Sequence, residues 1–242
     1  MLYKGISLSK FFLMRLFAAL LSVIFIAGCA SKFHHQPEVF ERRQHAMIRE
    51  ILSAQRQITD FNESGTITIA QDGKRSSGKC DVRLKPDGSF RAQVYSPFGT
   101  TALRIDADSL DVRLRAGKDE YSFALDESSP RELPFGLGYY FTFRQLIQIL
   151  AGNMPKEAAL LDTRPDSLVF DKSYAAALWN RDALILESRI SRKSEILESV
   201  TFNYNIEGDT FTLRFARFKN GIPGEITIRS DSKNYILLRY DR

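Results

Sequence analysis

Apolar and polar residues alternate with a period of two through most of the chain beyond residue 60. Six short segments with this alternation lie between residues 66 and 125, and about six more lie between residues 167 and 240. In a β-strand such alternation places the apolar side chains on one face. Turn dipeptides such as Asp72-Gly73 and Asp87-Gly88 separate neighbouring segments. The pattern therefore predicts antiparallel strands joined by short hairpins.

Two segments have the spacing of a helix instead. Residues 38–58 carry apolar residues on one helical face and charged residues on the opposite one. A second helix is predicted to begin after Thr142, because the side chains of Thr142 and Gln145 can form a capping box. We expect this helix to end at Gly152. Two helices cover only part of a sheet with this many strands.

These elements predict a mainly β fold with some α: one curled antiparallel sheet of about 11 strands, covered in part by a few helices. Residues 38–242 show no internal repeat and no linker rich in Gly, Pro or Ser, so we expect one domain. A twisted sheet of this size curls, and it then either packs its own interior or leaves an apolar cavity. The pattern leaves both possibilities open, and it assigns no role to residues 156–182.

The N-terminus has the pattern of a bacterial lipoprotein signal peptide. Residues 1–28 contain three cations, no acidic residue and an apolar run over residues 16–26. The run leads into Ile-Ala-Gly-Cys at residues 26–29, which matches a lipobox. Small residues fit the signal peptidase and the Cys29 thiol accepts diacylglycerol, so we predict cleavage before Cys29 and a lipidated tether over residues 29–37. An uncleaved anchor helix with an incidental cysteine is the alternative.

Charge and cysteine content narrow the range of partners. Loss of the signal peptide lowers the net charge from +5 to +2. This balance predicts no basic stripe, so we expect no nucleic-acid partner. The chain has two cysteines, Cys29 and Cys80, which are too few for a disulfide framework. Once Cys29 is lipidated, Cys80 is the only free thiol, and its place in a strand indicates inert packing.

Catalytic motifs are missing from the sequence. It contains no Gly-x-Ser-x-Gly and no Gly-rich phosphate loop, and all three histidines fall in the tether and the first predicted helix. Asp106, Asp108 and Asp111 fall at a strand end and a turn, where carboxylates are commonly solvated. We therefore predict a non-enzymatic protein with no metal, and no cofactor other than the covalent diacylglycerol and N-acyl lipid on Cys29.

Four stretches, taken in chain order, resemble the LolB outer-membrane lipoprotein receptors and the wider LolA/LolB-like superfamily. Residues 64–69 are similar to the family's opening strand, and residues 96–105 to its strand–loop–strand connection with Pro and Gly. Residues 142–155 are similar to its helix that ends in Gly-x-Pro, and residues 222–228 to its penultimate, proline-containing strand. Together these stretches span most of residues 40–240.

The resemblance implies a half-open barrel whose helices form a lid over a cavity for the acyl chains of lipoproteins. It also implies a periplasmic LolA-like carrier that hands lipoproteins over for insertion into the outer membrane. Pro97, Phe98 and Gly99 match the family's protruding membrane-insertion loop; the alternative is that Phe98 packs beneath a neighbouring loop. Ala30 follows Cys29 in place of the Asp that tends to retain lipoproteins at the inner membrane, which implies anchoring at the periplasmic face of the outer membrane.

One-sided alternation and the resemblance together define the residues that we expect to line an apolar cavity: Ile67, Ile69, Val82, Leu84, Phe90, Val94, Leu103, Ile105, Val112, Tyr140, Phe143, Leu146, Phe202, Phe211 and Leu213. Two functions follow. The first is a monomeric, membrane-anchored lipoprotein that binds acylated lipoproteins or lipid and helps insert them into the outer membrane. The second is an envelope-assembly scaffold with a packed barrel and no lipid transfer.

Overall fold

The computed structural model describes residues 42, 45–50, 60–125, 131–132, 138–139, 141–194, 196–206 and 209–241. The chain forms two compact units, Met1–Arg43 and Gln44–Arg242. All strands described below belong to the second unit. The predicted signal peptide, Cys29 and the tether lie outside the described residues.

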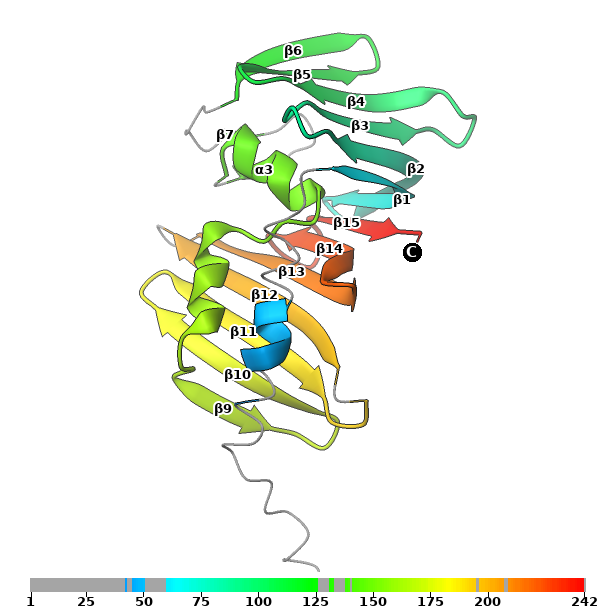
Figure 1. Ribbon diagram of the computed structural model, residues 1–242. Coiled ribbons are helices and arrows are strands. Elements are labelled where there is room, and N and C mark those ends of the chain that lie inside the picture. Colours follow the sequence, from blue (N-terminus) through cyan, green and yellow to red (C-terminus); the bar gives the residue numbers. More distant parts are fainter. Residues whose placement is uncertain are drawn as a thin grey trace, which may run out of the picture. The chain divides into compact units, whose positions relative to one another are not determined.

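Thirteen strands form one antiparallel sheet in the second unit (Figure 1). The N-terminal strands are β1 (Phe61–Gln71), β2 (Lys74–Leu84), β3 (Phe90–Tyr95), β4 (Thr101–Ala107), β5 (Asp111–Ala116) and β6 (Asp119–Ala124). The C-terminal strands are β9 (Ser167–Phe170), β10 (Tyr174–Arg181), β11 (Leu184–Ser191), β12 (Leu197–Ile206), β13 (Asp209–Lys219), β14 (Ile222–Arg229) and β15 (Tyr235–Tyr240). Their spatial order is β6-β5-β4-β3-β2-β1-β15-β14-β13-β12-β11-β10-β9.

The open, mainly β architecture confirms the predicted fold class, but the sheet has more strands than predicted. β7 (Arg131–Glu132) and β8 (Gly138–Tyr139) form a separate two-stranded sheet and are too short to give an alternating signal. The sequence pattern also missed β10. Its three consecutive alanines, Ala175, Ala176 and Ala177, are all buried, so polar residues do not alternate with apolar ones there.

β1 pairs with β15 and so joins the N-terminal strands to the C-terminal strands. Gly65 lies opposite Tyr240, Ile67 opposite Leu238, and Ile69 opposite Ile236. A Cβ atom on Gly65 would lie 2.1 Å from the carbonyl oxygen of Arg239, which is too close for any side chain. Glycine at this position therefore permits the approach of the two strands.

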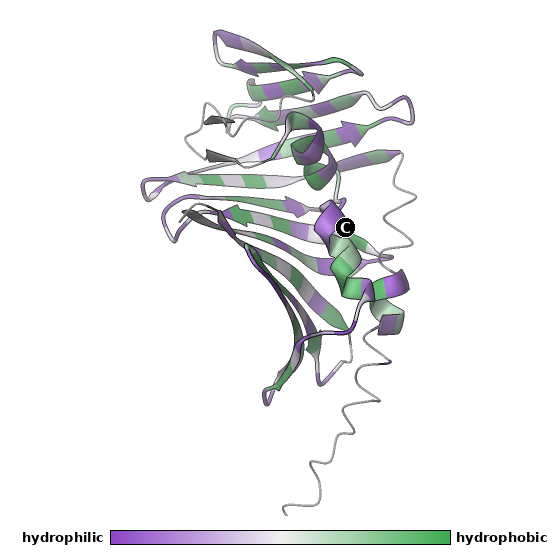
Figure 2. Cartoon of the chain, turned by 90° about the vertical axis from the view of Figure 1, so that its left-hand side faces the viewer, coloured by the Kyte–Doolittle hydropathy of each residue, from purple (hydrophilic) through white to green (hydrophobic). Residues whose placement is uncertain are grey.

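Apolar side chains gather on one face of the sheet, as alternation predicts. Figure 2 shows hydrophobic and hydrophilic residues alternating along the strands. Three helical segments cover this inner face: α3 (Phe143–Leu150), the 3-10 helix η2 (Lys156–Asp162) and helical residues 45–50. Within the described residues, no helix combines the length and the apolar character that crossing a membrane requires.

The capping box predicted for α3 is present. The Gln145 backbone N–H donates to the Thr142 hydroxyl at 3.2 Å, and the Thr142 N–H donates to the Gln145 side chain at 2.9 Å. The opposite end of α3 is fixed to the last strand, because the Tyr240 hydroxyl donates to the Leu150 carbonyl. The Phe143 ring stacks on Phe123 of β6 with centroids 4.6 Å apart. α3 is thus held at both ends over the N-terminal strands and β15.

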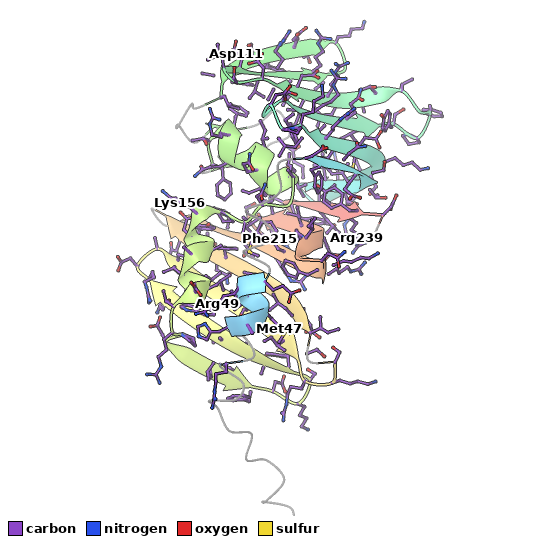
Figure 3. All side chains as sticks on the ribbon, viewed as in Figure 1. Met47, Arg49, Asp111, Lys156, Phe215 and Arg239 are labelled. Carbon is purple, nitrogen blue, oxygen red and sulfur yellow. The ribbon has the colours of Figure 1, made fainter. Side chains whose placement is uncertain are left out.

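Residues 156–182, to which the sequence assigned no role, supply η2, β9 and β10. Trp179 of β10 is fully buried, and its indole N–H donates to the Thr163 carbonyl just beyond η2 at 3.2 Å. Arg49 pairs with Asp162 at 2.9 Å, and Figure 3 shows Arg49 on the short helix next to η2. In this segment η2 covers the C-terminal part of the sheet, and β10 and β9 are the last two strands at its edge.

Candidate functional site: an apolar cavity beneath α3

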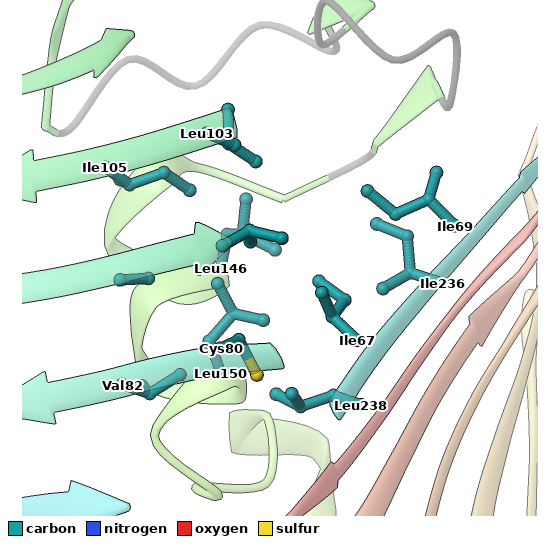
Figure 4. A pocket seen from close by; sticks show the side chains of 12 residues that line it. Ile67, Ile69, Cys80, Val82, Leu103, Ile105, Leu146, Leu150, Ile236 and Leu238 are labelled. Carbon is teal, nitrogen blue, oxygen red and sulfur yellow. The ribbon is translucent and has the colours of Figure 1, made fainter. Parts of the chain in front are cut away.

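A cavity of about 40 Å³ lies between α3 and the inner face of the N-terminal strands (Figure 4). β1 to β4 and β15 form its floor, and α3 forms its roof. The lining is apolar apart from one thiol and consists of Ile67, Ile69, Cys80, Val82, Ala92, Val94, Leu103, Ile105, Leu146, Leu150, Ile236 and Leu238. Such a lining offers no hydrogen-bonding group that could orient a polar ligand.

The periodicity of α3 supplies the roof. Leu146 and Leu150 are one turn apart on the same helical face, and both line the cavity. A second space of about 10 Å³ continues beneath the same helix, and Ile105, Leu146 and Leu150 line both spaces. The same small set of side chains therefore separates the two cavities.

One end of the cavity leads toward the β3–β4 hairpin. Val94 and Leu103 pair across β3 and β4 immediately before the hairpin turn, and both are only half-buried. Ile69, at the same end of β1, is also half-buried, whereas Val82 and Ile105 deeper in the sheet are buried. The lining is thus most accessible beside the hairpin that carries Phe98.

The structure places the sequence-predicted cavity residues in three environments. Those that line the larger cavity are Ile67, Ile69, Val82, Val94, Leu103, Ile105 and Leu146. Val112 and Phe143 line the smaller one. Leu84, Phe90, Phe202, Phe211 and Leu213 are buried and line neither of these two cavities. Tyr140 lies outside the described residues.

Five lining residues were not among those predicted: Cys80, Ala92, Leu150, Ile236 and Leu238. Cys80 and Ala92 are in phase with predicted residues of β2 and β3, so the alternation contained the signal for them. Ile236 and Leu238 enter the cavity through the β1–β15 pairing, and local pattern does not reveal pairing between the two ends of a chain.

The C-terminal part of the inner face is filled by aromatic rings instead. Tyr204 stacks on Phe211 with centroids 4.5 Å apart, and the Phe141 ring meets Phe211 edge-on at 5.4 Å. Phe202 packs against both Tyr204 and Phe215. Burial raises the pKa of Tyr204, with Glu157 adding to the effect, so the hydroxyl stays protonated. Aromatic packing of this kind leaves little room for a ligand.

The β3–β4 hairpin is a hydrogen-bonded turn over residues 96–100. The Gly99 N–H donates to the Ser96 carbonyl at 2.9 Å, and the Ser96 N–H donates to the Thr100 carbonyl at 2.8 Å. The Phe98 N–H donates to the Ser96 hydroxyl at 3.2 Å. Gly99 adopts a φ of +79°, which glycine reaches without strain. These bonds hold the tip in one conformation.

Phe98 projects from this turn with 92% of its surface exposed, so it does not pack beneath a neighbouring loop. Pro97 and Gly99 both favour this turn. Pro97 has no backbone N–H that would need an acceptor, and Gly99 closes the turn. Contact between Phe98 and a membrane stays a prediction.

Two of the three carboxylates considered for catalysis, Asp106 and Asp108, have local partners. Arg91 and Arg104 both donate to Asp106, at 2.7 and 2.5 Å. Asp108 accepts the backbone N–H groups of Leu110 and Asp111 and so stabilises a turn. Across the described part of the chain, no three His, Cys, Asp or Glu residues group together as a metal site would require. These contacts give Asp106 and Asp108 structural roles, in an ion-pair cluster and in a turn.

Comparisons with known proteins rest on structure alone, since no family model and no curated protein matches the sequence. A LolA superfamily protein from Nitrosomonas europaea is 12% identical; the match covers 81% of this chain and 92% of that one, with a TM-score of 0.45. The lipoprotein LppX from Mycobacterium tuberculosis is 12% identical; the match covers 82% of this chain and 93% of LppX, with a TM-score of 0.35. LprF from Mycobacterium bovis is 12% identical; the match covers 82% of this chain and 91% of LprF, with a TM-score of 0.36.

Cys80 should be almost unreactive in the folded domain. It is buried in the cavity floor, and burial, with the charges of Asp81 and Asp241, raises its pKa to about 12. The thiol is therefore protonated at neutral pH, and the thiolate is the reactive form. In a chain that begins after Cys29, maleimide should label Cys80 at pH 8 at least ~100-fold more slowly in buffer than in denaturant.

The control for this measurement is Ser76→Cys in a Cys80→Ala background. Ser76 is exposed on the same strand, so its replacement should react at similar rates in buffer and in denaturant. Rapid labelling of Cys80 in buffer would contradict the buried position of this thiol.

Proposed function

We propose that this domain binds acyl chains, of lipids or of acylated proteins, between α3 and the N-terminal strands. The observation that supports the proposal is a cavity lined by apolar side chains and one buried thiol, whose more accessible end lies beside a hairpin with an exposed Phe98. An apolar lining favours a ligand that needs no hydrogen bonds. The proposed role is binding and transfer rather than catalysis.

Binding requires α3 to move. A cavity of about 150 Å³ holds a molecule of the size of benzene, so a space of about 40 Å³ cannot hold an acyl chain. Each buried methylene group contributes about 0.8 kcal/mol, and ten of them would contribute roughly 8 kcal/mol. That is comparable with the cost of detaching a short helix and exposing its apolar face. The ligand would then replace the contacts that α3 makes with the sheet.

The N-terminal sequence extends the proposal to location. A lipid on Cys29 would hold the protein in a membrane, and the residue after Cys29 favours the outer membrane. A tether over residues 29–37 would keep the domain on the periplasmic face. In this setting a LolA-like carrier would deliver acylated proteins, and Phe98 would enter the lipid headgroup region as the chains pass into the membrane.

A second function has support from one observation. The small cavity volume and the aromatic packing around Tyr204 and Phe211 also suit an envelope-assembly scaffold that carries no lipid. In that case the interior would serve stability alone, and the outer surface would carry the function. Substitutions inside the cavity separate the two functions.

Filling the cavity should block acyl binding. Ala92 is buried in the cavity floor, so Ala92→Leu should weaken binding of a fluorescent fatty acid to the chain from residue 30 onward by at least about tenfold. Overpacking should cost only ~1–3 kcal/mol of unfolding free energy, which thermal melting would measure. Ala102→Leu, at an exposed position of β4, is the control and should leave binding unchanged. Absence of saturable binding by the parent chain would favour the scaffold, and saturable binding that Ala92→Leu does not alter would show that the acyl chain binds outside this cavity.

Loss of the exposed ring should separate delivery from binding. Phe98→Glu should leave the melting temperature and acyl binding unchanged, because Phe98 is 92% exposed. Transfer of an acylated protein to liposomes should fall, since a carboxylate disfavours entry into the headgroup region. Val169→Glu, which changes another exposed apolar residue on β9, is the matched control. Undiminished transfer by Phe98→Glu would count against the insertion role.

Lipidation should depend on Cys29 alone. Labelled palmitate should enter the wild-type chain in cells and should not enter Cys29→Ala, because the lipobox places the reactive thiol there. Membrane fractionation of the two chains gives a second readout. Equal labelling would show that the N-terminus is not a lipoprotein signal.

A further inference from the structure

The outer face of the N-terminal strands carries a basic hollow, on the opposite side of the sheet from the cavity. Its volume is about 380 Å³. Six cationic side chains line it: Arg83, Lys85, Arg91, Arg104, Arg113 and Arg115. The small net charge had predicted no basic stripe. The antiparallel register nevertheless gathers onto β2 to β5 cations that are dispersed along the sequence.

The register places like charges directly opposite one another. Arg83 lies opposite Arg91 across β2 and β3, and Arg104 lies opposite Arg115 across β4 and β5. Like charges in such positions destabilise a sheet. The lining contains two carboxylates, Asp106 and Asp108, and Glu120 pairs with Arg115 at 3.1 Å from outside it, so six cations against three carboxylates leave the hollow with a net positive charge. A surface selected for stability alone would not need this arrangement.

Asp106 organises the centre of the hollow. It accepts hydrogen bonds from Arg91 and Arg104. Its partial burial opposes ionisation, but the hydrogen bonds and charges of Arg104 and Arg91 outweigh burial and lower the pKa of Asp106. The carboxylate is therefore ionised at neutral pH and holds these two guanidinium groups. Arg113 lies opposite Asp106 in the sheet, and its charge contributes to lowering the pKa of Asp108. Among the described residues, however, no carboxylate lies within ion-pair distance of Arg83 or Arg113, so both guanidinium groups can still donate to an external anion.

The chemistry of the lining favours phosphate over an acidic protein surface. Guanidinium groups bind phosphate oxygens through paired, charge-assisted hydrogen bonds, and five of the six cations here are arginines. Protein interfaces instead have apolar centres that are depleted of charge. The two apolar residues of this lining, Phe90 and Ala107, are themselves buried. The accessible part of the hollow is thus polar and charged.

An exposed apolar residue borders the hollow. Leu110 lies in the β4–β5 turn with 73% of its surface exposed, and its N–H donates to Asp108 of the lining. Figure 3 labels Asp111, the next residue, at this end of the strands. Cations flanked by an exposed apolar side chain are typical of surfaces that contact lipid headgroups.

We propose that this basic hollow docks the domain on a membrane by binding the phosphate groups of anionic lipids. The proposal does not depend on acyl binding, because the cavity lies on the other face of the sheet. It gives the outer face of β2 to β5 a role of its own. Binding should be electrostatic, so salt should weaken it.

Vesicle flotation tests the docking. The probe is the chain from residue 29 onward with Cys29→Ala, so that no lipid anchor contributes. At low salt it should bind vesicles of phosphatidylcholine with phosphatidylglycerol, and it should bind pure phosphatidylcholine vesicles much more weakly. Arg83→Glu with Arg113→Glu should lower the affinity for the anionic vesicles at least about tenfold, because each basic residue near an anionic surface contributes substantially.

Lys172→Glu with Lys219→Glu is the matched control, since it makes the same change of charge at exposed positions of the C-terminal strands and turns. It should leave the affinity within about twofold of the parent chain. Circular dichroism melting verifies that both double variants fold. If the Arg83→Glu, Arg113→Glu chain does not fold, Arg83→Gln with Arg113→Gln replaces it and should still weaken binding more than the control.

Three results would overturn the docking proposal. The first is equal affinity for neutral and anionic vesicles. The second is equal loss of affinity in the outer-face variant and the control. The third is saturable binding of inorganic phosphate, or of a glutamate-rich peptide, by a chain that does not bind anionic vesicles. Failure of fatty-acid binding in the cavity would leave the docking unaffected, so the two proposals fail separately.

Discussion

The antiparallel pairing of β1 with β15 is the interaction on which the rest of this structure depends. It turns two runs of consecutive hairpins into one sheet of thirteen strands. It also completes the cavity floor, because Ile67 and Ile69 come from β1 while Ile236 and Leu238 come from β15. Gly65 makes the pairing possible, since a side chain there would meet the backbone of Arg239. Without the β1–β15 pairing, neither the floor of the cavity nor the surface on which α3 packs would be complete.

The apolar inner face of the sheet is shielded from water in two different ways. Over the C-terminal strands, stacked rings and the segment that follows α3 fill the interior. Over the N-terminal strands a single amphipathic helix covers a broad apolar surface and leaves space beneath it. Contacts at the ends of α3 fix its position: the Phe143 ring stacks on Phe123 of β6, and the hydroxyl of Tyr240 donates to Leu150. The same sheet thus has a packed part and a part that can yield.

Local features of this fold could be predicted from the sequence, and long-range ones could not. The alternation identified most strands, and the spacing of Thr142 and Gln145 was enough to predict the capping box of α3. Strand β10, with its run of alanines, was not predicted because burial on both faces removes the alternating signal. The pairing of β1 with β15 was not predicted because no local pattern encodes it. The outer basic hollow escaped for the same reason: its arginines meet only in the register of β2 to β5, and a small net charge conceals them.

The bond from Tyr240 to Leu150 has a consequence for the order of folding. Tyr240 ends β15, so the roof of the cavity cannot be fixed in place until all thirteen strands of the sheet have been synthesised. Pairing of β1 with β15 likewise closes a loop of about 170 residues, and such non-local contacts form slowly. A newly synthesised chain would therefore spend its early life with the apolar faces of many hairpins uncovered, a state that is prone to aggregation.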